Sequence, residues 1–427
     1  MKNWIKEQLA GGKIREIYEI TMKTLDDRQT AEGYFPESFT GKYEGAFARS
    51  VGAQALFLIE QGKLEQAKVL LQNLFNIVKA FHLPRFPHWY DTRHPRMDMV
   101  DQVDGDAHMI LAYATYCLET GDQEMIDAYY SFACKMIVTI FSAPYFYDGS
   151  KPVDFGGDWD RYPEKLQQVA EEDYVVDPNA LNLVHNFFFE HSREYHMWDC
   201  CDFLTQCFAG KAADQMILLM KKKSDEKLAA WLEKKCQAHR LGIAKNMTFQ
   251  QDGKTMYWEM LTGQPLKPFP ALGWPLFGYT ATGWEGVDWE IFCNTIDYLL
   301  ERTTMTDPVT GAKINMKEYL PNGKIFPATS TKMVGWTMEY CMATGKWDRI
   351  ADWIRFFSEN YPCKILTECA IPMDKDGNPL VYRGKVFFEG DDFPKDIGWL
   401  VEDGGSGEQC IWFCRALRRI MKALDVL

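Results

Sequence analysis

The sequence predicts an all-α fold, an (α/α)6 toroid of six helical hairpins, formed by residues 1–427 as a single domain with minor β-hairpins in its long loops. Three observations lead to this prediction. Apolar residues recur at three-to-four-residue spacing along most of the chain. Tight glycine turns join several of these periodic segments. Long connections rich in Trp, Asp, Pro and Gly separate the hairpins.

The helical spacing of apolar residues is the dominant pattern. It is found at 46–61, 64–81, 107–120, 124–141, 180–195, 203–221, 226–242, 289–302, 332–344, 348–360 and 409–424. Asp177, Pro178 and Asn179 resemble a helix start ahead of the segment 180–195. Strand-like alternation is short, as at 245–250 and 381–388. An all-helical fold therefore fits the pattern better than a βαβ repeat.

Three turns place a glycine in a similar context. E-Q-G-K contains Gly62, E-T-G-D contains Gly121 and A-T-G-K contains Gly345. Glycine can adopt the left-handed conformation that ends a helix, and in each case the next helix begins almost at once. Each turn therefore predicts an antiparallel hairpin. The separations of 59 and 224 residues correspond to one and four steps of about 56 residues, which suggests six hairpins.

Six long connections lie between the hairpins. They are 26–44, 83–103, 142–176, 251–283, 305–331 and 361–407. Long loops within a compact domain are usually functional. If the short turns all lie at one end of a ring, the long connections meet at the other end. We therefore expect an acidic, aromatic pocket there.

The overall charge limits the partners of the protein. The net charge is −13, so neither nucleic acid nor an anionic membrane is expected as the main partner. The basic run 221–223 is interpreted as a solvated helix end. Residues 1–10 contain no apolar signal segment, and no apolar run approaches the length of a membrane span. We therefore expect a cytoplasmic protein; its oligomeric state is left open.

The cysteines predict no disulfide framework and no metal site. The chain has 12 cysteines, without the spacing of a disulfide scaffold. Cys200 and Cys201 are adjacent, and Cys410 and Cys414 are one helical turn apart. Reduced thiols are expected. Neither a pair of C-x-x-C units nor H-E-x-x-H occurs, so we expect no metal and no other cofactor.

The first candidate site is the loop G-G-D-W-D-R-Y-P at 156–163. Asp158 and Asp160 flank Trp159, and Arg161 follows. A carboxyl group against an aromatic face is partly desolvated, which raises its pKa and suits it to proton donation. The simpler interpretation is a capped turn, in which Asp160 accepts backbone N–H bonds ahead of a short helix.

The second candidate site lies near the C-terminus. Glu389 follows two phenylalanines at the end of a predicted strand, and Glu408 opens the last helix. An acid at a helix start is also common for electrostatic reasons alone. The glycine-rich run before Glu408 contains neither Gly-Lys-Ser/Thr nor G-x-S-x-G, which excludes a P-loop and a hydrolase elbow.

The third candidate is the segment 88–108, which is dense in histidines and carboxylates. It lacks a compact metal-ligand spacing, so a hydrogen-bonding rim is the favoured interpretation. Asp104 is expected at the entry to an inner helix, where its carboxylate could hold sugar hydroxyls. His88, His94 and His108 are the candidates for histidine chemistry.

These motifs together resemble the six-hairpin glycosidases, which include trehalases, processing α-glucosidases and glucoamylases. Asp158-Trp159-Asp160, followed by V-D-P-N-A-L at 176–181, is similar to the Ser-Gly-Trp-Asp loop and Val-Asp-Leu-Asn-Ala helix of that group. Phe388-Glu389 and G-G-S-G-E at 404–408 resemble its Glu loop and its Gly-Glu stretch. F-A-R-S, ending at Ser50, stands where the group has Tyr-Trp-Asp.

The resemblance implies an inverting glycoside hydrolase that acts on an α-glucoside or a related oligosaccharide, with an exo mode of attack. Asp160 would be the general acid, and Glu389 or Glu408 the general base, with the carboxyl groups ~6.5–9.5 Å apart. Residues expected to contact the sugar are Trp159, Trp89 and Trp284 by stacking, and Asp158, Arg161, Arg93 and Asp104 through hydroxyl groups.

Three other functions use similar residues. A sugar epimerase of the acylglucosamine or cellobiose type would rely on pocket histidines. A polysaccharide lyase would need a Tyr or His base and positive charge near an acidic sugar, which the acidic composition disfavours. A carbohydrate-binding protein without catalysis is the fourth possibility.

Overall fold

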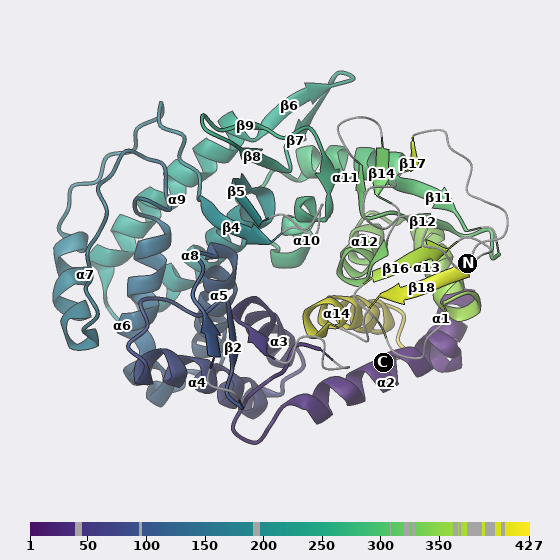
Figure 1. The fold of residues 1–427 in the computed structure, drawn as a ribbon, viewed down its shortest axis with the longest axis horizontal. Helices are drawn as coiled ribbons and strands as arrows, with labels where there is room; N and C mark the ends of the chain where they lie inside the picture. The colour runs from purple at the N-terminus through teal and green to yellow at the C-terminus, as the bar shows by residue number, and fades with distance from the viewer. Residues whose placement is uncertain are drawn as a thin grey trace.

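Six inner helices form a closed ring, and outer helices surround it, in the computed structural model of the protein (Figure 1). The structure describes residues 1–38, 45–93, 96–190, 197–307, 309–319, 324–326, 329–361, 366, 369–373, 387–388, 398–402 and 406–427. Within these ranges the inner helices are α3 (Ala48–Glu60), α5 (Val103–Thr120), α8 (Phe203–Lys222), α10 (Gly278–Thr282), α12 (Thr331–Ala343) and α14 (Gly407–Ala423).

Each inner helix packs against the next, and α14 packs against α3, which closes the ring. The remaining helices are α1 (Lys2–Gly11), α2 (Lys13–Arg28), α4 (Leu64–Ala80), α6 (Gln123–Ile140), α7 (Tyr162–Ala170), α9 (Glu226–Asn246), α11 (Trp289–Thr303) and α13 (Trp347–Glu359), with 3-10 turns η1 (Trp159–Arg161) and η3 (Trp274–Phe277). The predicted (α/α)6 toroid is confirmed.

Short turns connect each inner helix to the following outer helix. Gly62, Gly121 and Gly345 have φ of 73°, 65° and 72°, so the predicted left-handed turns are confirmed. The predicted spacing is wrong between Gly121 and Gly345. Two further turns lie there, at Ser224 (φ 60°) and Gly283 (φ 61°), where steps of 56 residues require three. The reason is the long connection between α6 and α8, which contains α7 and two strands.

Ten of the eleven predicted helical segments correspond to helices of the structure, and the segment 180–195 does not. A turn at 178–179 precedes it, and its described part contains the strand β4 (Asn186–Glu190), paired with β5 (Met197–Asp202). Backbone partners outside the segment compete with the helix: the N–H of Asn182 donates to Tyr147 O at 2.8 Å, and the N–H of His185 donates to Tyr145 O at 2.7 Å. Tertiary contacts override the local start signal.

The strands lie in small sheets formed by the long connections. They are β1 (Ala46–Phe47), β2 (Trp89–Asp91), β3 (Arg96–Asp98), β4, β5, β6 (Thr248–Gln251), β7 (Lys254–Tyr257), β8 (Met260–Thr262), β9 (Lys267–Pro268), β10 (Leu272–Gly273), β11 (Thr304–Thr306), β12 (Lys313–Asn315), β13 (Glu318–Tyr319), β14 (Lys324–Phe326), β15 (Thr329–Ser330), β16 (Cys369–Met373), β17 (Phe387–Phe388) and β18 (Gly398–Glu402).

Pairing between strands of different connections brings the long loops to one end of the ring. The sheet β10-β13-β14-β17 combines three connections, and β4-β5-β8-β9 combines two. Strands β1, β5 and β15 lead directly into α3, α8 and α12. The N-terminal ends of these inner helices therefore face the long loops. We call this the loop end, and the opposite side with the short turns the turn end.

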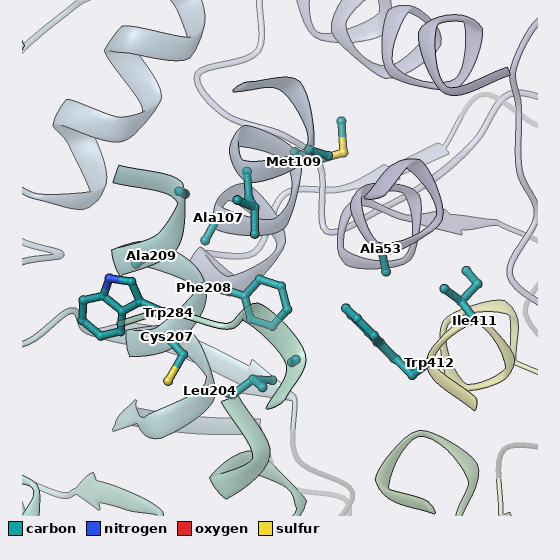
Figure 2. Close-up of a cluster of buried hydrophobic side chains, with 14 of the residues drawn as sticks. Ala53, Ala107, Met109, Leu204, Cys207, Phe208, Ala209, Trp284, Ile411 and Trp412 are labelled. Carbon is teal, nitrogen blue, oxygen red and sulfur yellow. The ribbon is translucent and has the colours of Figure 1, made fainter. Parts of the chain in front are cut away.

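Side chains fill the middle of the ring. Phe208 of α8 and Trp412 of α14 point toward each other from opposite sides (Figure 2), with ring centroids 6.1 Å apart. Ala53 of α3 and Ala107 of α5 contribute small side chains to the same cluster. At Gly335 of α12 an added Cβ would lie 2.6 Å from the carbonyl oxygen of Trp412. The ring therefore encloses a packed core, and any site must lie at one of its ends.

Two observations concern the predictions on cysteines and membranes. Ten cysteines of the described chain are free thiols, and all of these except Cys293 are buried: Cys117, Cys134, Cys200, Cys201, Cys207, Cys236, Cys293, Cys341, Cys410 and Cys414. No helix among the described residues combines the length and the apolar character that crossing a bilayer requires.

Candidate functional site

The inner helices carry charged side chains at equivalent positions of the loop end. Arg49, Asp104, Lys332 and Glu408 are each the second residue of α3, α5, α12 and α14. Asp202 directly precedes α8. The N-terminus of a helix favours acids and disfavours cations. The two cations in these first turns therefore need carboxylate partners.

Those partners are supplied by the neighbouring helices. Arg49 Nη1 donates to Asp104 Oδ2 at 3.1 Å, and Arg49 Nε donates to Glu408 Oε2 at 3.0 Å. Lys332 Nζ lies 3.3 Å from Glu408 Oε1. All four side chains are buried, with residue exposures between 0% and 9%. One guanidinium thus joins two carboxylates from different helices in a low-dielectric setting.

Hydrogen bonds extend this network to α8. Asn186 of β4 donates from Nδ2 to Asp104 Oδ1 at 3.1 Å and to Thr205 Oγ1 at 3.3 Å. The N–H of Thr205 donates to Asp202 Oδ1 at 2.7 Å, so Asp202 caps α8. The network runs without interruption from Asp202 to Lys332. It connects α8, α5, α3, α14 and α12.

Two carboxyl groups of the network have pKa values shifted in opposite directions. Burial alone would raise the pKa of Glu408, but the charges of Arg49 and Lys332 outweigh it and lower the pKa to about 2. Burial raises the pKa of Asp202 to about 7, and the nearby charge of Asp104 adds to this effect. Near neutral pH, Glu408 is ionised and Asp202 holds a proton for much of the time. Such a divergence of two carboxyl pKa values is typical of acid–base sites.

A third buried acid, Glu37, holds the start of α14. The backbone N–H of Glu408 donates to Glu37 Oε1 at 3.1 Å, and the hydroxyl of Ser406 donates to the same oxygen. Burial raises the pKa of Glu37. The contact fixes the first turn of α14, and with it the position of Glu408.

Tryptophans lie directly behind the charges. Lys332 Nζ stands 3.9 Å from the ring centroid of Trp274, a cation–π contact. Trp412 Nε1 donates to Glu408 Oε1 at 3.3 Å. Trp336 stands between these two rings, with centroids 6.4 Å from Trp274 and 5.3 Å from Trp412. Trp274, Trp336 and Trp412 form an aromatic floor beneath the network.

Another buried carboxyl, Glu259, lies between β7 and β8. An added Cβ at Gly273, next to Trp274, would lie 3.1 Å from Glu259 Oε2. The pKa of the Cys200 thiol is raised well above its usual value by burial and by nearby groups that include Asp202, Glu259 and Asp104. Glu259 therefore belongs to the same acidic region at the loop end.

The overall arrangement matches solved structures, although no protein-family model and no curated protein matches the sequence. A metal-independent α-mannosidase of Streptococcus pneumoniae with α-1,6-mannobiose aligns at a TM-score of 0.61 and 12% identity, covering 100% of this chain and 98% of that one. A bacterial glucoamylase with acarbose aligns at 0.59 and 12%, covering 96% of this chain and 55% of that one. The cellobiose 2-epimerase of Spirochaeta thermophila aligns at 0.56 and 13%, covering 98% of both chains.

The chain has the fold of the six-hairpin glycosidases. The resemblance stated from the sequence is confirmed at the level of the fold. Sequence identities this low do not by themselves show a shared activity. In this six-hairpin fold, two of the predicted site residues come together: Asp104 and Glu408 share the guanidinium of Arg49. Glu389 and His94 lie outside the described residues.

The loop predicted to hold the general acid lies on the outer surface of the six-hairpin ring. Asp158, Asp160 and Arg161 are exposed, and Asp158 caps η1. The ring of Trp159 stacks on Phe132 of the outer helix α6, with centroids 4.4 Å apart. The adjacent α7 packs against α6 and α9 and lies at the far edge of the molecule in Figure 1. This position separates Asp160 from the buried charges. The turn is capped, but the cap is Asp158, which accepts from the N–H of Asp160 at 3.1 Å, and not Asp160 as the capped-turn interpretation had it.

The prediction that Trp284 stacks on substrate is wrong. Its ring is fully buried, stacks on His239 at 5.1 Å and donates from Nε1 to Asp214 at 2.9 Å. Gly210 of α8 leaves the space that this indole fills, because a Cβ there would lie 2.2 Å from the ring. Trp284 is therefore part of the packing between α8 and α9.

The other predicted sugar contacts lie at the loop end, on the sheet β1-β2-β3. Trp89 is half-buried, with the guanidinium of Arg96 at 5.7 Å from its ring. Arg93 is exposed and donates from Nε to Asp91 Oδ1 at 3.2 Å. These residues lie near the start of α3, because β1 of the same sheet leads directly into that helix.

His88 and His108 of the third candidate segment hold structural positions. His108 is fully buried, stacks on Phe208 at 3.5 Å and donates from Nδ1 to Asp104 O at 2.7 Å. Burial lowers the pKa of His108 to about 4, so it is neutral near pH 7. His88 lies 3.5 Å from Asp98 through Nδ1. Neither contact provides a pair of histidines facing one site.

Sequence reasoning missed Arg49, Lys332, Asn186, Asp202, Glu259 and the aromatic floor. A usable signal existed for the first two: Arg49 and Lys332 lie at the start of the predicted helical segments 46–61 and 332–344, where the helix dipole disfavours a cation. Asn186 and Glu259 had no such signal, because they lie in connections whose course depends on strand pairing.

Proposed function

We propose that the protein is a carbohydrate-active enzyme, a glycoside hydrolase whose active site is the network at the loop end. The observation that carries this proposal is that one buried hydrogen-bond network joins two carboxyl groups whose pKa values are shifted in opposite directions, Glu408 downward and Asp202 upward. The aromatic floor supports it, because tryptophan faces are the usual partners of sugar rings. The fold shared with a glucoamylase and an α-mannosidase is consistent with the same class.

The proposed reaction is a single displacement with inversion. Asp202 gives its proton to the glycosidic oxygen as the bond to the anomeric carbon breaks. A water molecule attacks that carbon from the opposite face and gives a proton to Glu408, whose negative charge also balances the positive charge developing on the sugar. Arg49 and Lys332 hold Glu408 in place. Glu389 stays a predicted second candidate for the base.

The two carboxyl groups stand at opposite ends of the network, with Arg49, Asp104, Asn186 and Thr205 between them. An inverting mechanism needs room for a water molecule as well as the sugar, so its carboxyl groups cannot be adjacent. We propose a hexose α-glycoside as substrate, attacked from its chain end, because the site is at the end of a closed ring.

The test is turnover of nitrophenyl glycosides and plain disaccharides by the parent enzyme and by Glu408→Gln and Asp202→Asn. Each substitution keeps the shape of the side chain and removes its acid–base function. We expect losses of about 10²–10⁴-fold for each, and a product of inverted anomeric configuration by NMR. A loss of less than tenfold in both variants would remove these residues from the chemistry.

The products distinguish the rival functions. A product of unchanged mass would identify an epimerase, for which the likeness to a cellobiose 2-epimerase is the reason to test. Ultraviolet absorbance from a new double bond would identify a lyase. Saturable sugar binding without any product would identify a binding protein.

A further inference from the structure

A cavity opens at the turn end, away from the network of Arg49. Its volume is about 750 Å³, within the range of roughly 300–1,000 Å³ that is usual for small-molecule sites. Its walls come from the C-terminal halves of the inner helices and the start of α11. None of the residues discussed for the loop end lines it.

The strongest charges of this cavity are already paired. Arg415 binds Glu339 with both Nε and Nη2 at 2.8 Å, and Arg419 binds Glu60 with Nε and Nη2 at 2.8 Å. Arg419 also reaches Glu339 at 2.9 Å. These two arginines and two glutamates balance in charge and hold one another rigidly. The pairing favours a neutral ligand over an ionic one.

Polar side chains without internal partners face the same cavity from α5 and α8. Thr115 and Glu119 are one turn apart on α5, and Lys211 and Gln215 are one turn apart on α8. None of these four makes a side-chain hydrogen bond or ion pair within the described part of the chain. They offer an ammonium, an amide, a hydroxyl and a carboxylate. A ligand that carries both donors and acceptors, as a polyol does, can satisfy all four.

An aromatic wall completes the cavity. Trp289 lines it while 41% exposed, whereas tryptophans such as Trp284 and Trp412 are buried. Tyr279 lies 5.2 Å from the Trp289 ring and Tyr340 lies 6.4 Å from it. An exposed indole at the rim of a polar cavity provides a flat apolar face beside hydrogen-bonding groups. A sugar ring has the same two properties, an apolar C–H face and hydroxyl groups at its edge.

We infer that the turn end holds a second, non-catalytic binding site for a neutral sugar of one or two rings. Trp289 stacks on the ring, and Lys211, Gln215, Thr115 and Glu119 bind the hydroxyl groups. Binding without catalysis follows from the pairing of Glu60 and Glu339 with arginines, which leaves no buried carboxyl group free to donate a proton. The site does not depend on the hydrolytic activity proposed for the loop end.

The experiment is a calorimetric titration of the full chain with glucose, cellobiose and α-1,6-mannobiose. The Glu408→Gln background prevents turnover during the titration. In that background we expect Trp289→Ala, and separately Lys211→Met, to weaken binding of the preferred sugar by about tenfold. Leu218→Ala, an exposed position of α8 outside the cavity, is the matched control and should leave binding unchanged.

Turnover separates this inference from the proposed function. Trp289→Ala in the otherwise unchanged chain should hydrolyse its substrate at the parental rate at saturation. The inference would be overturned if sugar affinity were equal in the variants Trp289→Ala, Lys211→Met and Leu218→Ala. It would also be overturned if none of the three sugars bound to the Glu408→Gln chain. Hydrolysis without sugar binding at the turn end would support the proposed function and reject this inference. Sugar binding at the turn end without hydrolysis would support this inference and reject the proposed function.

Discussion

The loop end and the turn end of the ring use the same ion pair, arginine with glutamate, in opposite electrostatic settings. At the turn end, Arg415 donates to Ala281 O at 2.8 Å and Thr280 O at 3.0 Å, the last carbonyls of α10, while it binds Glu339. A cation at a helix C-terminus agrees with the helix dipole. At the loop end, Arg49 and Lys332 lie in the first turns of their helices, where the dipole opposes them.

The two ends differ in what their ion pairs do: those of the turn end stabilise the fold, and those of the loop end set the charge of a candidate catalytic residue. The turn-end pairs satisfy both the dipole and the carbonyl groups, so they stabilise the ring. The loop-end cations lie at helix N-termini, where the helix dipole is unfavourable for them, but they keep Glu408 ionised. Departures from local rules are expected at functional sites. The following predictions test this contrast.

The largest effect is expected from removing the arginines. Arg49→Met removes the cation that Asp104 and Glu408 share, although Lys332 still faces Glu408, and Arg415→Met removes one of the two arginines that bind Glu339. Each should lower the free energy of unfolding by about 3–5 kcal/mol, measured by urea denaturation. Only Arg49→Met should also abolish turnover under conditions where the protein stays folded. A folded Arg415→Met protein without activity would contradict the contrast between the ends.

Asp202→Asn should change how stability depends on pH. The folded pKa of Asp202 is raised to about 7 from its ordinary value of 3.8, so between these two pH values the unfolded chain has lost a proton that the folded chain retains. The parental free energy of unfolding therefore has a component that falls as pH rises through this window, by up to about 1.4 kcal/mol per pH unit. Asn at 202 removes that component.

The measurement is the difference between the unfolding free energies of variant and parent at several pH values from 4 to 8. The difference should grow in favour of Asp202→Asn as pH rises. A constant difference would show that Asp202 titrates normally in the folded protein, and would remove the argument for it as a proton donor.

A moderate effect is expected where α12 crosses α14. Gly335→Ala places a Cβ 2.6 Å from the Trp412 carbonyl, so the helices must separate slightly, at a cost of about 1–3 kcal/mol. Because Lys332 and Glu408 lie near the start of these helices, turnover should also fall. Gly11→Ala is the control, since nothing lies within 4 Å of its Cβ. Equal melting temperatures of the two variants would exclude close packing at Gly335.

The smallest effect is expected on the outer surface. Asp160→Asn changes an exposed side chain next to α7, so the free energy of unfolding should shift by no more than about 0.5 kcal/mol. Turnover should stay within twofold of the parental rate. A loss of 100-fold or more would restore Asp160 as the general acid and contradict the assignment of the active site to the loop-end network.

The periodic pattern was sufficient to predict most helices, but not the site. Gly62, Gly121 and Gly345 take up the left-handed conformations that their context indicates, because a helix end is decided by a few neighbouring residues. The motif around Asp160 looked equally convincing. It failed to join the site because Trp159 finds its stacking partner in Phe132, which is distant in sequence and lies on an outer helix.

Local sequence alone determined the helical hairpins, the turn positions with glycine and the acidic character of the first turns at Asp104 and Glu408, since each depends on residues within one or two turns. Tertiary structure alone decided that Asp104 and Glu408 share one guanidinium, that Asp202 keeps its proton, and that Trp284 is a core residue. These properties arise from burial and from charges on other helices, and both exist only after the ring has closed.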